Sequence, residues 1–282
     1  MINLDIRANI LSEALPYILK YKDKIMVIKY GGNAMINEEL KKMVMEDIVM
    51  LHSIGMKVVL VHGGGPEISS MLKKIGKESV FKDGLRVTDL ETVDVVLQVL
   101  SGKINKSLVK ELNLAGGNAI GLSGIDSLLI KAKPVDPNLG YVGDIEDINP
   151  KVILDLLDKN YIPVISTVGY DDLGNVYNIN ADTASARIAG ALNASKFILM
   201  TDIKGVLKDK ENPDSLIKTI NVSEIKGLEK QGIIDGGMVP KVACCIEAKR
   251  RGVSNVVIID GRVKHSILIE VLTDEGVGTE FK

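Results

Sequence analysis

Three segments of this chain join glycines or short polar residues to the end of an apolar run. They are Lys29-Tyr30-Gly31-Gly32, Gly63-Gly64-Gly65-Pro66 and Asn178-Ile179-Asn180-Ala181-Asp182. The first two precede a helical pattern, and backbone N–H groups that collect at a helix N-terminus bind anions. These residue types therefore indicate a site for phosphate or another anion.

Lys29 ends its apolar run, with the glycines Gly31 and Gly32 close behind. An unpaired ammonium is costly to bury, so a lysine that faced the core here would need an anion beside it. For an isolated Lys-x-Gly-Gly, a solvent-exposed lysine at a strand end is the better explanation. A single glycine-rich turn is weak evidence, because a flexible turn also explains it. Two such turns on successive strands favour the anion site.

Asp182 and Lys241 extend the same pattern along the chain. Asn178, Asn180 and Asp182 alternate, so they would share one face of an extended segment. The simpler alternative is an aspartate that caps a helix, with polar loop neighbours. Lys241 follows Gly236-Gly237 near the start of a helix, whose positive end a lysine normally avoids, so an anion is expected nearby.

Two lysines, one carboxylate and several glycine amides suit phosphoryl transfer. That reaction requires mainly alignment and donors around the charge that develops on the transferred group. The sequence contains no Walker A motif, no Rossmann G-x-G-x-x-G and no protein-kinase motif set. A nucleotide would have to be held by another arrangement.

Composition narrows the function classes. With 46% hydrophobic and 26% charged residues, the 282-residue chain is typical of a folded globular protein. A net charge of −2 and 4% aromatic residues without Trp give no footprint for nucleic acid or for a membrane surface. The apolar runs are strand-sized, and the adjacent Cys244 and Cys245 argue against a disulfide framework, so a cytoplasmic location is expected.

The elements that must position these residues alternate along the chain. Periodicity predicts a strand at 25–29, a helix at 38–53, a strand at 57–61 and a helix at 66–75. This order is typical of a mainly parallel sheet with helices on both faces. The later expected elements are a helical stretch at 89–114, strands at 119–122, 162–166, 196–201 and 255–259, a connection through 171–175, helices at 150–160, 181–192, 223–231 (with Ser223 as N-cap) and 239–250, and a last apolar segment at 266–272.

Two segments fall outside this alternation. Strand-like runs at 128–132 and 141–148 flank the turn-rich residues 134–138, which predicts a small antiparallel hairpin flap. Residues 4–21 repeat apolar side chains at helical spacing, interrupted by Pro16. The apolar face of that helix packs either on its own domain or on another subunit, and the sequence leaves both open.

Together these motifs resemble the amino-acid kinase superfamily, and within it the N-acetylglutamate kinase family. The resemblance covers essentially the whole chain. It implies a three-layer αβα sandwich around a mainly parallel open sheet, with an N-terminal oligomerisation helix at 1–22, an acyl-acceptor lobe at 23–193 and a nucleotide-binding lobe at 194–282. Besides the segments around Lys29, His62 to Gly65 and Asn178 to Asp182, it rests on Gly84-Leu85-Arg86-Val87-Thr88, Thr201-Asp202-Ile203-Lys204-Gly205-Val206 and Gly237-Met238-Val239-Pro240-Lys241.

The resemblance also implies a reaction. ATP would phosphorylate the side-chain carboxylate of N-acetyl-L-glutamate by direct in-line transfer, in arginine biosynthesis. That carboxylate is ionised at neutral pH because its ordinary pKa is about 4.3, so no protein base is required and His62 is expected to be structural. Mg²⁺ would arrive with ATP, bound mostly by phosphate oxygens and water, and no protein metal ligand is assigned.

Roles follow for individual residues. Lys29 would contact the γ-phosphoryl group, Lys241 the β–γ side and the leaving ADP, and Asp182 both ammonium groups. Arg86 would bind the α-carboxylate of the acceptor, as a guanidinium does with two parallel hydrogen bonds. The remaining implied sites are Gly31, Gly32 and Gly64 for the phosphoryl group, Gly63, Gly64, Gly65, Asn178 and Asn180 for the acceptor, and Thr201, Asp202, Gly205, Val206, Leu207, Gly236, Gly237 and Met238 for the nucleotide.

Regulation is implied as well. Arginine-inhibited members of the family carry an extra N-terminal helix that interlaces dimers into a hexamer, and a C-terminal pattern similar to residues 265–279 of this chain. Feedback inhibition by arginine and a homohexamer are therefore expected. The candidate effector residues are Tyr17, Lys196, His265, Glu270, Gly276 and Gly278.

Three alternatives remain open. The first is a sibling kinase that acts on glutamate, aspartate, carbamate or a nucleoside monophosphate, although Arg86 and the Asn-x-Asn-x-Asp pattern favour acetylglutamate. The second is a non-catalytic arginine sensor, which would tolerate the loss of Lys29, Asp182 or Lys241. The third is a structural assembly protein. Substrate-dependent ATP turnover separates the kinases from the other two.

Deletion of residues 1–20 is expected to shrink the oligomer and abolish arginine inhibition while catalysis persists, because an effector must bias an element that has two states. Size-exclusion chromatography and an ADP-release assay with and without arginine measure both effects. A truncated chain that stayed hexameric and equally inhibited would contradict this prediction.

Overall fold

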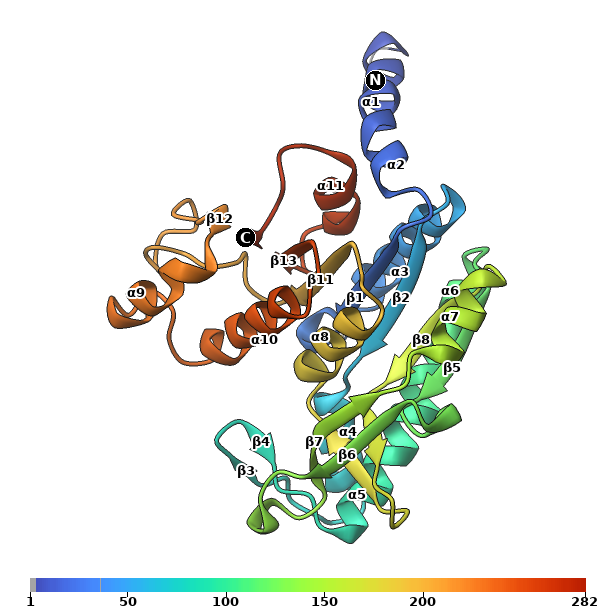
Figure 1. Ribbon diagram of the computed structural model, residues 1–282, viewed down its shortest axis with the longest axis vertical. Helices are drawn as coiled ribbons and strands as arrows, with labels where there is room; N and C mark the ends of the chain where they lie inside the picture. Colours follow the sequence, from blue (N-terminus) through green and yellow to red (C-terminus); the bar gives the residue numbers. More distant parts are fainter. Residues whose placement is uncertain (1–3, 36) are drawn as a thin grey trace.

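A computed structural model describes residues 4–35 and 37–282 of the chain (Figure 1). Its centre is an eight-stranded sheet of order β12-β14-β13-β11-β1-β2-β8-β5. Neighbouring strands pair in parallel except β13 and β14, which are antiparallel. The strands are β1 (Ile25–Tyr30), β2 (Lys57–His62), β5 (Ala119–Ser123), β8 (Ile162–Ser166), β11 (Lys196–Thr201), β12 (Thr219–Ile220), β13 (Asn255–Asp260) and β14 (Thr279–Phe281).

Side chains of the central strands alternate between two hydrophobic cores. Met26 and Ile28 of β1 pack into one core, whereas Val27 packs into the other. The first core is closed by α3 (Glu38–Ser53), α4 (Gly65–Lys74), α5 (Leu90–Leu97), α6 (Asn105–Leu114) and α11 (Ser266–Leu272), and the second by α7 (Lys151–Asp158), α8 (Ala181–Ala191), α9 (Ile225–Lys230) and α10 (Met238–Arg250). The predicted three-layer αβα sandwich is confirmed.

Local sequence explains where several elements begin. The predicted helix at 38–53 is α3, and the Asn37 side chain caps it by accepting a hydrogen bond of 3.0 Å from the Leu40 N–H. The predicted stretch at 89–114 starts after Asp89, which caps α5 in the same way. It then passes through a π-helical segment, Gln98–Ile104, before α6. Near α9, the prediction of Ser223 as cap is wrong, because Asn221 and Glu224 form a capping box.

The expected hairpin flap is part of a larger unit. β6 (Ile130–Pro134) and β7 (Val142–Ile148) are antiparallel, but β9 (Val168–Tyr170) and β10 (Val176–Ile179) join them in a closed four-stranded barrel. Residues 171–175, expected as a plain connection, turn β9 into β10. The Asp171 carboxylate accepts hydrogen bonds from the N–H groups of Leu173 and Asn175 and so stabilises this turn.

Several short elements carry no readable periodicity in the sequence. β3 (Phe81–Lys82) and β4 (Leu85–Arg86) form a small antiparallel hairpin that projects beside the barrel strands (Figure 1). The edge strands β12 and β14 are also short. The last apolar segment is the helix α11.

The N-terminal segment is two helices rather than one. α1 (Leu4–Glu13) and α2 (Leu15–Tyr21) meet at Ala14 and project away from the body of the protein (Figure 1). Pro16 explains the break, because it lacks an N–H and its ring would crowd the carbonyl of Ser12. Ala14, Tyr17 and Ile18 pack against the first core, while Ile10, Leu11, Leu15 and Leu19 are exposed.

Within residues 4–35 and 37–282, none of the helices is both long and apolar enough to cross a membrane.

Candidate active site

The order of the strands creates a crevice at the end of β1. From β1 the chain adds β2 on one side, continues outward, and later returns to add β11 on the other side. Loops that leave the carboxyl ends of β1 and β11 therefore run in opposite directions, which is the position where α/β sheets bind ligands. Lys29, opposite Val61 of β2 and Leu199 of β11, lies at this point.

Lys29 points to the face of the sheet that α8 and α10 cover. It follows Val27 by two residues, and Val27 belongs to the core beneath those helices. Asn180 caps α8, since its Oδ1 accepts hydrogen bonds from the N–H groups of Asp182 (2.9 Å) and Thr183 (3.1 Å). Because α8 begins at Ala181, the Asp182 side chain lies in its first turn, beside Lys29.

Asp182 holds two ammonium groups. Its Oδ1 lies 2.8 Å from the Lys29 Nζ, and its Oδ2 lies 3.3 Å from the Nζ of Lys241, in the first turn of α10. Burial raises the pKa of the Asp182 carboxyl, but attraction to the two ammonium groups outweighs burial, so this pKa lies below its ordinary value. Two cations and one anion leave the cluster with an excess positive charge, which suits a polyanion.

Glycines leave the backbone beside this cluster uncovered. A Cβ at Gly31 would lie 3.1 Å from the Lys29 Nζ, and a Cβ at Gly64 would lie 2.1 Å from Cδ1 of Ile104. Gly32 has a φ of +70°, which favours glycine. Gly64 is the N-cap of α4, whereas the Gly63 N–H already donates to the Tyr30 carbonyl.

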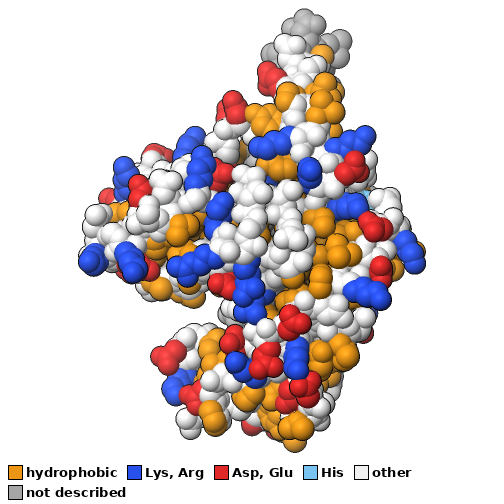
Figure 2. All heavy atoms as spheres, in the orientation of Figure 1, with side chains coloured by type: hydrophobic (Ala, Val, Ile, Leu, Met, Phe, Trp, Pro, Cys, Tyr) orange, Lys and Arg blue, Asp and Glu red, His pale blue; other side chains and the backbone are white. Residues whose placement is uncertain are grey.

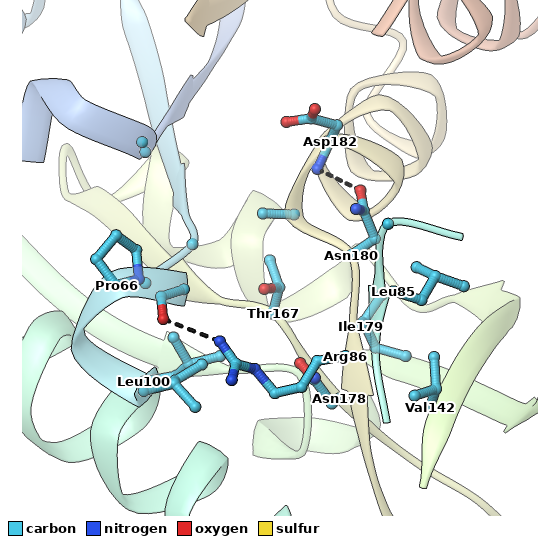
Figure 3. A pocket seen from close by; sticks show the side chains of 18 of the residues that line it. Pro66, Leu85, Arg86, Leu100, Val142, Thr167, Asn178, Ile179, Asn180 and Asp182 are labelled. Atoms are coloured by element: carbon cyan, nitrogen blue, oxygen red, sulfur yellow. Dashed lines mark hydrogen bonds between the residues drawn. The ribbon is translucent and has the colours of Figure 1, made fainter. Parts of the chain in front are cut away.

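A first pocket of about 300 Å³ extends from Asp182 to Arg86 (Figure 3). Its two ends come from α8 and from the β3–β4 hairpin. Figure 3 shows Arg86 and Asn178 together at one end and Asp182 at the other. Other lining residues are Lys29, Gly31, Gly32, Gly63, Gly64, Gly65, Ile68, Leu100, Val142, Thr167 and Asn180.

Arg86 is a buried cation whose described partners are neutral. Its guanidinium donates to the Ser79 hydroxyl (2.6 Å), the Ser69 hydroxyl (2.9 Å) and the Gly65 carbonyl (3.0 Å), and stacks on the Phe81 ring. Burial lowers the pKa of Arg86, although a guanidinium remains protonated in proteins. A carboxylate in the first pocket would supply the missing negative charge.

A second pocket of about 390 Å³ lies on the other side of Lys241. Of the predicted nucleotide residues, Asp202, Gly205, Leu207, Gly237 and Met238 line it, whereas Thr201 and Val206 are buried and do not, and Gly236 lies outside it. Ile203, which belongs to the quoted motif at 201–206, also lines it. Sequence reasoning missed the lining residue Ile233 and the ion pair between Lys210 and Asp235. Lys241 lines this pocket and contacts Asp182 of the first, so the two pockets adjoin.

The two pockets correspond to two parts of the molecular surface. Figure 2 shows that this surface is deeply indented between the part that carries α9 and α10 and the part that carries the β3–β4 hairpin. The second pocket takes Met238 from the first of these parts, and the first pocket takes Phe81 from the other.

Comparison with known proteins decides the family. A sequence profile described as the amino acid kinase family matches residues 24–260. The chain belongs to the amino acid kinase family. It is similar to an acetylglutamate kinase of Brachyspira hyodysenteriae, at 53% identity over 277 residues that cover 98% of this chain and 96% of that protein. An acetylglutamate kinase of Clostridium kluyveri is 52% identical over 96% of this chain and 97% of its own length.

Solved structures share the fold. An N-acetylglutamate synthase from Neisseria gonorrhoeae, complexed with coenzyme A and N-acetyl-glutamate, has a TM-score of 0.83 at 23% identity. The match covers 97% of this chain but 63% of that longer chain. A carbamate kinase of Giardia has a TM-score of 0.69 at 20% identity, with 92% of this chain and 98% of its own covered. At these identities the likeness shows the fold alone.

A third pocket, of about 290 Å³, takes lining residues from α2 and α11. Of the predicted effector residues, Tyr17, Lys196, Glu270, Gly276 and Gly278 line it. The buried Lys196 Nζ lies 2.8 Å from Oε1 of Glu270.

The structure places the remaining effector candidate, His265, outside the third pocket. It precedes α11, with its Nδ1 2.6 Å from Oδ1 of the buried Asp47 on α3. His265 has left-handed backbone angles (φ +56°) before the first turn of α11, and it is not among the residues that line the third pocket, whereas Glu270 of α11 is.

His62 has a structural environment, as expected. It is fully buried, its Nδ1 lies 3.0 Å from the Gly63 carbonyl, and its Nε2 lies 3.2 Å from the Asn105 amide nitrogen. A ring that donates from Nδ1 and accepts at Nε2 is neutral. Burial lowers the pKa of His62 to about 4.

Stability is therefore expected to fall as the pH drops from about 6.5 to about 4. In that window the unfolded chain binds a proton at His62 that the folded chain does not, which lowers the free energy of unfolding by about 2 kcal/mol at pH 5. Urea unfolding of the unaltered chain and of His62→Gln at pH 7.5 and pH 5 measures this. The comparison at pH 7.5 gives the cost of the substitution itself, and equal losses between the two pH values would contradict the prediction.

Proposed function

We propose that this chain transfers the γ-phosphoryl group of ATP to the side-chain carboxylate of N-acetyl-L-glutamate, forming N-acetyl-L-glutamyl 5-phosphate and ADP. The observation that carries the proposal is the Lys29–Asp182–Lys241 cluster at the junction of two pockets, in a chain about half identical to acetylglutamate kinases over nearly its full length. One pocket would hold the acceptor and the other the nucleotide.

The transfer needs charge compensation and alignment. A carboxylate oxygen of the acceptor attacks γ-phosphorus while the bond to the β–γ bridging oxygen breaks, and ADP leaves with that electron pair. Lys29 and the amides of Gly31, Gly32 and Gly64 would face the moving phosphoryl group, and Lys241 the oxygen that becomes part of ADP. Asp182 keeps both ammonium groups in place, and the acceptor needs no protein base because it is already ionised.

The first pocket offers a place for each part of the acceptor. Arg86 would bind the α-carboxylate, which gives its guanidinium the anionic partner that its serine and carbonyl contacts do not supply. Asn178 would bind the acetamido group, and Gly63, Gly64, Gly65 and Asn180 would line the remainder. Asn180 contributes chiefly through its backbone position and its amide nitrogen, because its Oδ1 caps α8.

The second pocket would hold the nucleotide. Its apolar members, among them Leu207 and Met238, suit a purine ring, and Asp202, Gly205 and Gly237 would lie along the adenosine and phosphates. Thr201, Val206 and Gly236 would support the pocket from positions that do not line it. Mg²⁺ would enter as part of the ATP substrate, bound mostly by phosphate oxygens and water.

A chain of two lobes fits the assignment of the acceptor to one pocket and the nucleotide to the other. The boundary proposed near residue 193 separates β1, β2, β5 and β8 from β11, β12, β13 and β14, and it runs between the neighbours β1 and β11. Residues 23–193 would then carry the acceptor and residues 194–282 the nucleotide, with phosphoryl transfer across the boundary.

The third pocket supports a second proposal, inhibition by arginine. Its lining combines Glu270, Asp274 and Glu275 with Lys196 and Lys218, which suits a zwitterionic amino acid with a cationic side chain. Residues 1–22 would join dimers into a hexamer through their exposed apolar side chains, and Tyr17 of this segment lines the same pocket. His265 would act from outside the pocket, which it does not line.

One assay tests the proposed reaction. ADP release is measured with N-acetyl-L-glutamate, glutamate and aspartate as acceptors. The expected order is a clear preference for N-acetyl-L-glutamate, because free glutamate lacks the acetamido group that Asn178 would bind. Equal or faster turnover of another acceptor would assign the chain to a sibling kinase, and no turnover with any acceptor would favour a non-catalytic role.

Lys29→Ala and Lys241→Ala are each expected to lower kcat by at least about 100-fold, because each removes a donor from charge that develops during transfer. Asp182 keeps one ammonium partner in either variant, so the free energy of unfolding should change far less. The matched control is Lys131→Ala, which removes a lysine from an exposed ion pair with Asp172. A kcat for Lys29→Ala that matches the control would refute the assigned role.

Glu270→Gln is expected to raise the arginine concentration for half-inhibition by about tenfold or more, with little change in kcat, because it removes a carboxylate that would pair with a cationic ligand. Inhibition curves at fixed substrate concentrations measure the shift. Glu39→Gln, a change in an exposed ion pair with Lys264, serves as control. Identical inhibition of both variants and the unaltered chain would exclude this pocket.

A further inference from the structure

Thr88 ends the Gly84-Leu85-Arg86-Val87-Thr88 segment and has no place in the mechanism above. Its side chain is fully buried. Its Oγ1 donates a hydrogen bond of 2.7 Å to the Arg86 carbonyl and accepts one of 3.3 Å from the Nδ2 of Asn178. A hydroxyl has one proton to donate and lone pairs to accept, so it makes both bonds at once.

These two partners are the residues to which the proposed function assigns adjacent parts of the acceptor, the α-carboxylate and the acetamido group, which share one carbon atom. Arg86 comes from the β3–β4 hairpin and Asn178 from β10 of the barrel, and both line the first pocket. Figure 3 shows their side chains at the same end of that pocket. The Thr88 hydroxyl is thus a direct link between the hairpin that carries the guanidinium and the strand that carries the amide.

The backbone of Thr88 is held independently of this hydroxyl. Its N–H donates to the Leu139 carbonyl (2.9 Å), and its own carbonyl accepts from the Tyr141 N–H (2.6 Å). Gly140, with a φ of +67°, makes this approach possible, because a Cβ there would lie 2.3 Å from the Thr88 carbonyl oxygen. Loss of the hydroxyl should therefore leave the chain path intact and disturb only Arg86 and Asn178.

We propose that Thr88 is a positioning residue of the acceptor site, whose hydroxyl sets the placement of Arg86 relative to Asn178. The inference rests on the proposed function and deepens it. Without the hydroxyl, the Asn178 amide loses the acceptor that fixes its rotation, and the Arg86 carbonyl loses a donor that holds the hairpin against the barrel. The acceptor would then meet its two recognition groups at the wrong spacing.

Thr88→Val tests this, because valine keeps the branched shape and removes only the hydroxyl. The expected result is a rise of about tenfold in KM for N-acetyl-L-glutamate, the effect of buried polar groups left without a partner, with KM for ATP within about twofold of the unaltered chain. Thr88→Ser, which retains the hydroxyl and loses a methyl group, should restore KM for the acceptor. In an Asn178→Ala background, Thr88→Val should raise KM by a smaller factor than in the unaltered chain.

The outcomes separate this inference from the proposed function. If the unaltered chain does not phosphorylate N-acetyl-L-glutamate, the proposed function fails and this inference fails with it. If it does, and Thr88→Val leaves KM for the acceptor within twofold, the inference alone is overturned. Equal increases in KM for acceptor and ATP, or the same increase in Thr88→Ser, would show a merely structural role. Should Thr88→Val not fold, Thr88→Ala provides a second variant without the hydroxyl, judged by the same criteria.

Discussion

The carboxylate of Asp182, shared by the ammonium groups of Lys29 and Lys241, is the interaction on which the rest of the site depends. An ammonium at the end of a buried strand is tolerated only beside an anion, and here one anion serves two cations from β1 and α10. The cost of burial is thus met by pairing, while the excess positive charge remains for a ligand. The contact between Asp182 and Lys241 also joins the two proposed lobes beside β1.

The strand order of the sheet places the site at the end of β1, and glycines leave the backbone there accessible to a ligand. Reversal of strand order around β1 opens a crevice at its carboxyl end, which side chains would fill at most positions. Gly31 and Gly64 line it without side chains, and a Cβ at Gly64 would lie 2.1 Å from Cδ1 of Ile104, so no larger residue fits there. Backbone amides can therefore reach a ligand next to the lysines, as phosphoryl transfer requires.

β11 connects two of the pockets. Lys196, its first residue, pairs with Glu270 in the third pocket, and Thr201, its last, precedes Asp202 of the second. A ligand that altered the Lys196–Glu270 pair would act on one end of a buried six-residue strand whose other end adjoins the proposed nucleotide site. The geometry gives the proposed inhibition a physical connection to catalysis without requiring the two ligands to meet.

Sequence periodicity alone determined the long elements, among them α3, β8 and β11, because burial against one face repeats locally at 3.6 or 2 residues. Residue type and position, rather than periodicity, singled out the lysines and glycines, because a lysine or a run of glycines is unusual at the ends of buried strands and at helix starts. Only the tertiary structure decided the barrel around β9 and β10, the placement of His265 outside the third pocket and the link from Thr88 to Asn178. Such short strands and contacts, which join residues distant along the chain, leave no period in the sequence, because they are set by packing between elements rather than within them.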